Sequence, residues 1–145
     1  MSSYVRINST SKRVISYSKL YVEKVLGYKF DFAISTRNYL LLDFDCGYNI
    51  EECISEAIEI SKVIVDELGG NVYIFKTNHG LHLIHDIFLP FSKIKTMLKA
   101  FKLLNTKYLD KKHIDACLRR GYLTLRLNQK KAILKVSKSG VEYYE

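Results

Sequence analysis

The chain has 145 residues, 48% of them hydrophobic, so it can bury a real core, and we expect a single domain over residues 1–145. No stretch approaches the roughly 20 apolar residues that cross a bilayer, and the N-terminus lacks the apolar segment of a secretory signal; we therefore expect no membrane contact and a cytoplasmic protein. The formal net charge is +8, and the three cysteines lack a CxxC spacing, which argues against a disulfide framework and a structural zinc site and favours reduced, packed cysteines.

The first quarter of the chain combines one helical pattern with two strand patterns. Apolar residues at helical spacing predict a helix over residues 11–26. Runs rich in aromatic and branched residues then predict strands over 30–35 and 39–45.

The middle of the chain has the pattern of a helix followed by a β-hairpin. Asn49, with a glutamate three residues later, predicts the N-cap of a helix whose apolar stripe stops at the glycine pair 69–70. The turn Thr77–Gly80 lies between two β-rich runs, so we predict a hairpin with strands over 71–76 and 81–89.

The last third begins with a basic amphipathic helix. Pro90 is expected to open it, and its apolar residues fall on one face of residues 90–104 with lysines on the other. Strands are predicted over 113–118, 122–128 and 131–137, with a possible edge strand over 141–145. The centre of the chain has the order β-α-β-β-α-β with a helix in front, which favours an α+β fold with an antiparallel-rich sheet and helices on one face.

Two acids at the end of the second predicted strand need an explanation. In a strand, Asp43 and Asp45 share one face, while Leu42 and Phe44 share the other. Two adjacent carboxylates repel each other unless a cation or a hydrogen-bond network lies between them. The pair therefore indicates a binding site, although acids that cap the next helix or face solvent are the simpler alternative.

Charge is distributed unevenly along the chain. Residues 31–70 contain nine acidic and two basic side chains, whereas residues 91–145 contain 14 basic and four acidic ones. This layout suits a polyanion-binding surface beside a carboxylate site, and solvated lysine-rich helix faces would give the same count.

Four features occur in a characteristic order. They are the strand "LLLDFD" with its two acids, the turn and strand Thr77–Leu83 with His82, the hydrophobic-Asp pair Ile114–Asp115, and "LRLNQKKAILKV" with Arg126. Residues 39–136 thereby resemble the catalytic core of the archaeo-eukaryotic primase superfamily, whose palm is RRM-like. Asn128 and Gln129 stand where the family usually has a proline and a serine.

The resemblance assigns a role to each feature. It implies three catalytic, metal-binding carboxylates, Asp43, Asp45 and Asp115, which would hold Mg²⁺ or Mn²⁺. It further implies a nucleotide-binding group that comprises Thr77, Gly80, His82, Arg126 and Lys130. The expected activity is a metal-dependent nucleotidyltransferase of the primase-polymerase type, which makes or extends primers from nucleoside triphosphates on a single-stranded DNA or RNA template. A replication partner protein would fit the small size of the chain.

Other interpretations use the same residues. The domain could be a non-catalytic nucleic-acid-binding or replication-accessory protein, or a protein-binding inhibitor or adaptor. Locally, His82 could be a core histidine, and Arg126 could form a salt bridge with Asp115. Asp115 could instead pair with Arg119, Arg120 or Lys112. A rolling-circle endonuclease is disfavoured because the sequence has no HxH, and a three-histidine zinc site is disfavoured because spacing three in a strand alternates faces.

Overall fold

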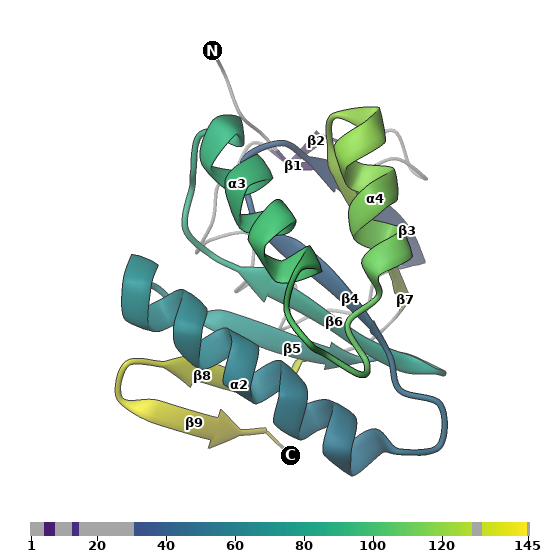
Figure 1. Ribbon diagram of the computed structural model, residues 1–145, viewed down its shortest axis with the longest axis vertical. Helices are drawn as coiled ribbons and strands as arrows, with labels where there is room; N and C mark the ends of the chain where they lie inside the picture. The colour runs from purple at the N-terminus through teal and green to yellow at the C-terminus, as the bar shows by residue number, and fades with distance from the viewer. Residues whose placement is uncertain (1–4, 8–12, 15–30, 129–131, 145) are drawn as a thin grey trace.

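The computed structural model describes residues 5–7, 13–14, 31–128 and 132–144, with side chains described for 36–125 and 132–144. Within these residues the chain forms two antiparallel sheets and three helices (Figure 1). The predicted α+β class with an antiparallel sheet is therefore confirmed.

The larger sheet has five strands in the order β4-β6-β5-β8-β9, all antiparallel. Their bounds are β4 Leu41–Asp45, β5 Val72–Lys76, β6 Gly80–His85, β8 Ala132–Ser137 and β9 Gly140–Tyr143. Because β6 lies between β4 and β5 and is antiparallel to both, β4 and β5 run parallel to each other. The predicted hairpin and the predicted strands over 131–137 and 141–145 lie in this sheet.

The smaller sheet has the strand order β2-β1-β3-β7. Its strands are β1 Val5–Ile7, β2 Arg13–Val14, β3 Asp31–Thr36 and β7 Leu123–Asn128, and β7 also lies beside β4. The N-terminal helix predicted over 11–26 is wrong at Arg13–Val14, which forms a strand, and residues 15–26 lie outside the described residues.

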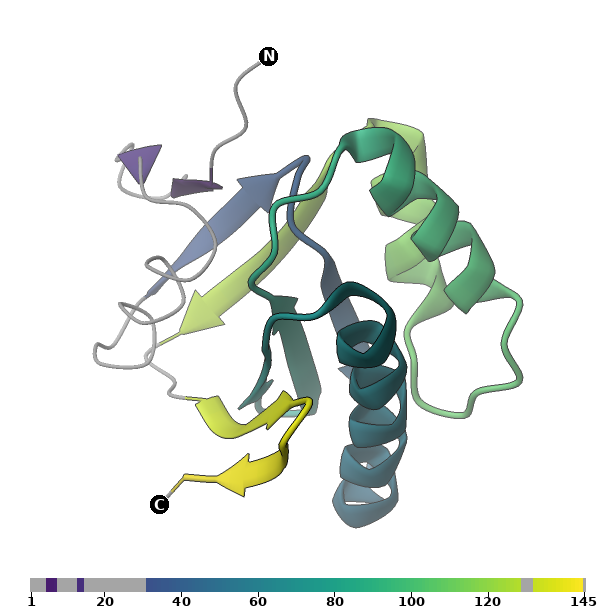
Figure 2. The same ribbon diagram turned by 90° about the vertical axis from the view of Figure 1, so that its left-hand side faces the viewer.

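Three helices, α2 Ile50–Leu68, α3 Phe91–Lys102 and α4 Lys111–Arg120, pack on one side of the strands, as Figure 2 shows. None of the helices in the described part of the chain has the length and apolar character needed to cross a membrane. The positions of α2 and α3 were predicted. The N-cap of α2 is Asn49, as predicted, but its side chain makes no capping hydrogen bond.

Helix α4 replaces a predicted strand over 113–118. The side chain of Asp110 caps it by accepting a hydrogen bond from the backbone N–H of His113, and Gly121 ends it in the left-handed conformation with φ of 84°. Its two buried residues, Ile114 and Cys117, are three positions apart, which is helical spacing. The strand prediction was wrong because the two caps and the helical spacing of the buried residues favour a helix over these residues.

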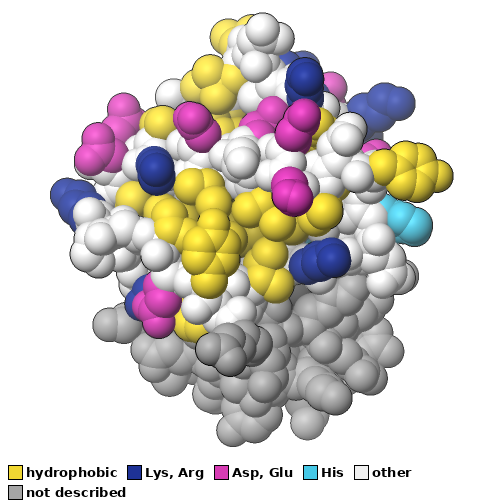
Figure 3. Space-filling view, turned by 90° about the horizontal axis from the view of Figure 1, so that it is seen from below, with side chains coloured by type: hydrophobic (Ala, Val, Ile, Leu, Met, Phe, Trp, Pro, Cys, Tyr) yellow, Lys and Arg dark blue, Asp and Glu magenta, His cyan; other side chains and the backbone are white. Residues whose placement is uncertain are grey.

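The core lies between the larger sheet and the helices. Strand β4 contributes Leu41, Leu42 and Phe44, each at most 1% exposed, and α2 contributes a buried stripe that includes Ala57 and Ile64. Fully burying an aliphatic or aromatic side chain of this size is worth about 1.5–3 kcal/mol. The surface seen from below carries hydrophobic side chains together with charges of both signs (Figure 3).

Candidate functional site

An open cleft of about 630 Å³ lies where β4 ends. Its lining combines acidic, histidine, aromatic and glycine residues: Asp43, Phe44, Asp45, Gly47, Tyr48, Thr77, His79, Gly80, His82 and Asp110. Among these described lining residues there are three carboxylates and neither lysine nor arginine. The cleft is therefore a place where a cation, or an anion bridged by a cation, would be stabilised.

The two acids of β4 point to the same side of the strand. Leu42 and Phe44 are buried, Asp43 is partly exposed, Asp45 is exposed, and both aspartates line the cleft. The alternation predicted from the sequence is thus what the structure shows.

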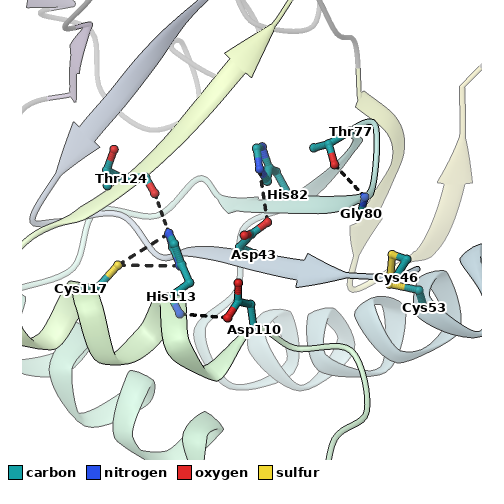
Figure 4. Close-up of polar contacts among 10 residues, drawn as sticks. All are labelled: Asp43, Cys46, Cys53, Thr77, Gly80, His82, Asp110, His113, Cys117 and Thr124. Carbon is teal, nitrogen blue, oxygen red and sulfur yellow. Dashed lines mark hydrogen bonds and ion pairs between the residues drawn. A yellow bond between two sulfur atoms is a disulfide. The ribbon is translucent and has the colours of Figure 1, made fainter. Parts of the chain in front are cut away.

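His82 lies directly across from Asp43 on the neighbouring strand. The two residues are register partners of β4 and β6, and His82 Nε2 is 3.3 Å from Asp43 Oδ1 (Figure 4). The His82 side chain is 12% exposed and that of Asp43 is 29% exposed, so both remain accessible from the cleft. The strand pairing therefore brings the first two predicted motifs into contact.

A third carboxylate, Asp110, reaches the cleft from the other side of β4. Residues 108–110 pair with β4: the backbone N–H of Asp110 donates to the carbonyl of Asp43 over 2.8 Å, and the N–H of Asp45 donates to the carbonyl of Tyr108 over 2.8 Å. Figure 4 shows the Asp43 side chain between His82 and Asp110. The sequence signal for Asp110 was present, because Leu109–Asp110 is also a hydrophobic-Asp pair.

Asp115, the predicted third acid, is placed elsewhere. It lies on α4, where its carboxylate forms an ion pair with Lys102 of α3, and it does not line the cleft. The expectation that a strand would carry Asp115 to the Asp43–Asp45 pair is wrong, because the residue is helical. Asp115 does form an ion pair, but its partner is Lys102 of α3 rather than Arg119, Arg120 or Lys112.

A glutamate of α2 holds the segment that carries Asp110. Glu56 accepts backbone N–H groups from Lys107, Tyr108 and Leu109 at 2.7, 2.9 and 2.8 Å. Hydrogen bonds to a carboxylate are stronger than those between neutral groups. No sequence signal identified Glu56, because its partners lie 51 to 53 residues away in the chain.

The hairpin turn forms another edge of the cleft. Thr77 closes it, since its hydroxyl accepts from the N–H of Gly80 over 2.8 Å and its own N–H donates to the carbonyl of Gly80 over 2.8 Å. A Cβ added to Gly80 would lie 1.8 Å from the carbonyl oxygen of Phe44. Glycine is therefore required at position 80 because β4 and β6 approach closely there.

A disulfide joins the end of β4 to the first turn of α2. Cys46 and Cys53 are bonded, and both are buried, whereas Cys117 is a free buried thiol. The expectation that all three cysteines are reduced is wrong for this pair, because the turn after β4 folds back onto α2. The disulfide fixes the rim of the cleft next to Asp45.

His113 of α4 adds a basic group near the acids. Burial lowers its pKa, but the Cys117 thiol, the Thr124 carbonyl and the charge of Asp43 outweigh burial, so the net pKa is raised above 6.5. Its Nε2 lies 2.7 Å from the carbonyl oxygen of Thr124. His113 therefore retains a proton more readily than an ordinary histidine.

The structure describes no side chain for two further predicted site residues, Arg126 and Lys130. Arg126 pairs through its backbone with Ala33 in the smaller sheet, and its side chain lies outside the described part of the chain, as does the whole of Lys130. Five of the eight predicted site residues line the cleft: Asp43, Asp45, Thr77, Gly80 and His82.

The comparisons with known proteins give no match. No protein-family model, no curated protein and no solved structure matches this chain. The functional interpretation therefore depends on the geometry of the cleft and on the sequence motifs.

Proposed function

We propose that this domain is a metal-dependent nucleotidyltransferase of the primase-polymerase type. The observation that carries the proposal is the contact between Asp43 and His82 in an open cleft that Asp45 and Asp110 also line. Asp43 and Asp45 resemble the DxD motif of that superfamily and His82 resembles its histidine motif, and the strand register sets Asp43 and His82 side by side.

The topology supports an RRM-like palm. The order β4-α2-β5-β6, with β6 between the parallel strands β4 and β5, is a split β-α-β unit followed by a hairpin. Two helices, α3 and α4, then precede β7, which lies beside β4. Such a palm would present the DxD strand near the middle of a continuous surface.

The donor set fits a divalent ion that arrives with its substrate. Within the described residues, no group of three or more His, Cys, Asp or Glu side chains is arranged to hold a metal by itself. Mg²⁺ is often bound by one or two carboxylates together with substrate phosphates rather than by a protein cage. Asp43 and Asp45 would supply those carboxylates, and the bound ion would neutralise phosphate charge and favour in-line attack by a 3′ hydroxyl.

The other residues of the cleft would position the substrate. His82 Nε2 lies 3.3 Å from Asp43 Oδ1 in the structure and would turn its single N–H to a phosphate oxygen when the substrate binds. Asp110 would take the position expected of Asp115, since the segment 108–110, which pairs with β4, places this acid next to Asp43. Nucleoside triphosphates and a single-stranded template would be the substrates, and the lysines of α3 and α4 would contact the template backbone.

The test is a primer-synthesis and primer-extension assay with labelled nucleotides, Mg²⁺ or Mn²⁺ and single-stranded template. We expect Asp43→Asn and Asp110→Asn each to lower product formation by at least about 100-fold, because each removes a charge beside the reacting phosphates. Asp115→Asn is the matched control and should leave the rate within about twofold.

Two outcomes would contradict the proposal. Loss of activity in Asp115→Asn with retention in Asp110→Asn would return the third role to Asp115. Absence of product from the wild-type protein, with template binding intact in all three variants, would favour the non-catalytic binding function.

A further inference from the structure

Tyr48 is the most exposed large hydrophobic residue of the described chain, with a relative exposure of 103%. It nevertheless lines the cleft, three residues after Asp45. A fully hydrated aromatic ring contributes nothing to the core, and its position beside a binding cleft indicates contact with a ligand.

The backbone that carries Tyr48 is held on both sides. Cys46 is bonded to Cys53, its N–H donates to the carbonyl of His79 over 3.0 Å, and the N–H of Asn49 donates to the carbonyl of Cys46 over 3.0 Å. Gly47 adopts a φ of 57°, which turns the chain so that Tyr48 follows at the rim. The ring is thus presented by a fixed turn.

His79 lies on the adjoining hairpin turn and also lines the cleft, with an exposed side chain. The hydrogen bond between Cys46 and His79 links the two turns. A flat ligand ring could therefore stack on Tyr48, with the imidazole ring of His79 near the edge of the ligand. A phosphate attached to that ligand would reach the carboxylates through a cation.

We propose that Tyr48 is a stacking platform for an unpaired nucleobase that enters the cleft. The proposal rests on the proposed function, in which the ligand of the carboxylate cleft is a nucleotide. Stacking tolerates any base, since every base has a π-face, and so Tyr48 would secure the ligand without selecting a sequence. The base belongs either to a nucleoside triphosphate or to single-stranded nucleic acid.

The test measures affinity without turnover. Fluorescence anisotropy would follow a fluorescein-labelled oligo-dT, and a separate titration would use a fluorescent, non-hydrolysable nucleoside triphosphate, both with Mg²⁺. Tyr48→Ala should weaken binding of one or both ligands by about 5- to 100-fold. Tyr48→Phe, which keeps the ring, should stay within about twofold of wild type. The ligand that loses affinity identifies the source of the base.

Two controls separate stacking from other effects. Tyr143→Ala removes another exposed tyrosine, on β9 away from the cleft, and should leave both affinities unchanged. An abasic oligonucleotide of equal length keeps the phosphates, so wild type should bind it about as weakly as Tyr48→Ala binds oligo-dT.

The proposal is overturned if Tyr48→Ala binds both ligands as wild type does, if neither ligand binds wild type, or if Tyr48→Phe falls as far as Tyr48→Ala. Failure of the proposed catalysis is a different result: binding that depends on Tyr48 without any primer synthesis would leave the stacking role standing. Primer synthesis by the wild-type protein, with an unchanged affinity in Tyr48→Ala, would support the proposed catalysis and overturn the stacking role.

Discussion

The cleft has two walls that are held by different interactions. In the strand wall, Asp43 and His82 are fixed by the continuous hydrogen-bond ladder of β4 and β6. The loop wall comprises residues 107–110, of which 108–110 pair with β4 and 107–109 donate to the carboxylate of Glu56.

The difference concerns how many interactions must fail before a carboxylate moves. Five register pairs join β4 and β6, so no single side chain positions Asp43. The loop wall has two backbone hydrogen bonds to β4, and its attachment to α2 depends mainly on Glu56, which accepts three hydrogen bonds. We therefore expect the strand wall to fail only with the fold, and the loop wall to loosen while the fold persists.

The largest expected effect on stability comes from Gly80→Ala, which disrupts the strand wall. The added methyl group would meet the Phe44 carbonyl oxygen at 1.8 Å and force β4 and β6 apart. We expect the free energy of unfolding, measured by urea denaturation, to fall by about 3 kcal/mol or more. Gly47→Ala is the control: no heavy atom lies within 4 Å of its added Cβ, and it should cost only about 1 kcal/mol for its positive φ. Equal costs would refute the role of close strand approach.

A smaller effect is expected from Glu56→Gln, which attacks the loop wall. Replacing the carboxylate weakens three charge-assisted hydrogen bonds, and the free energy of unfolding should fall by about 2 kcal/mol. Hydrogen exchange at Lys107, Tyr108 and Leu109 should accelerate more than that of β6. The control Glu59→Gln, at an exposed position of α2, should change stability by less than about 0.5 kcal/mol. Unchanged exchange at the three amides would show that the loop is held by other contacts.

The smallest effect is a pH dependence with opposite signs at two histidines, His85 on β6 of the strand wall and His113 on α4, which follows the loop wall. Burial lowers the pKa of His85 on β6 below 6.5, although the Gly69 carbonyl and the charge of Asp86 oppose the shift. The unfolded chain therefore binds the proton first, and stability should decrease as pH falls below 6.5. His113, whose pKa is raised, stabilises the fold below 6.5 and loses that contribution as pH rises through its folded-state pKa.

Urea denaturation between pH 5 and 8 would separate these two contributions. His85→Gln should flatten the acid side of the stability profile, and His113→Gln should flatten the side above 6.5. A profile that neither variant alters would contradict both assignments.

The elements with a strong local pattern could be predicted from the sequence. The strand that ends at Asp45, the helix over 50–68 and the hairpin around Thr77–Gly80 each depend on periodicity and turn residues within one segment. For the same reason, the shared face of Asp43 and Asp45 was predictable.

The rest of the candidate site depends on contacts between distant segments. Asp110 reaches Asp43 because residues 108–110 pair with β4, and Glu56 supports that pairing across more than 50 residues of sequence. Asp115 was misplaced since Ile114–Asp115 matched a motif, although the cap at Asp110 and the spacing of Ile114 and Cys117 indicate a helix. The disulfide was missed because cysteine pairing depends on which segments meet in the fold.

One turn of α2 contacts both rims of the cleft and connects them. Glu52 accepts a hydrogen bond from the Tyr108 hydroxyl, and Glu56 accepts backbone hydrogen bonds from residues 107–109. Cys53 forms the disulfide with Cys46. The rim that bears Tyr48 and the rim that bears Asp110 are thus attached to the same helical turn. A displacement of this helical turn would move both rims together. The distance between the rims would then change little, while both rims move relative to β4 and β6.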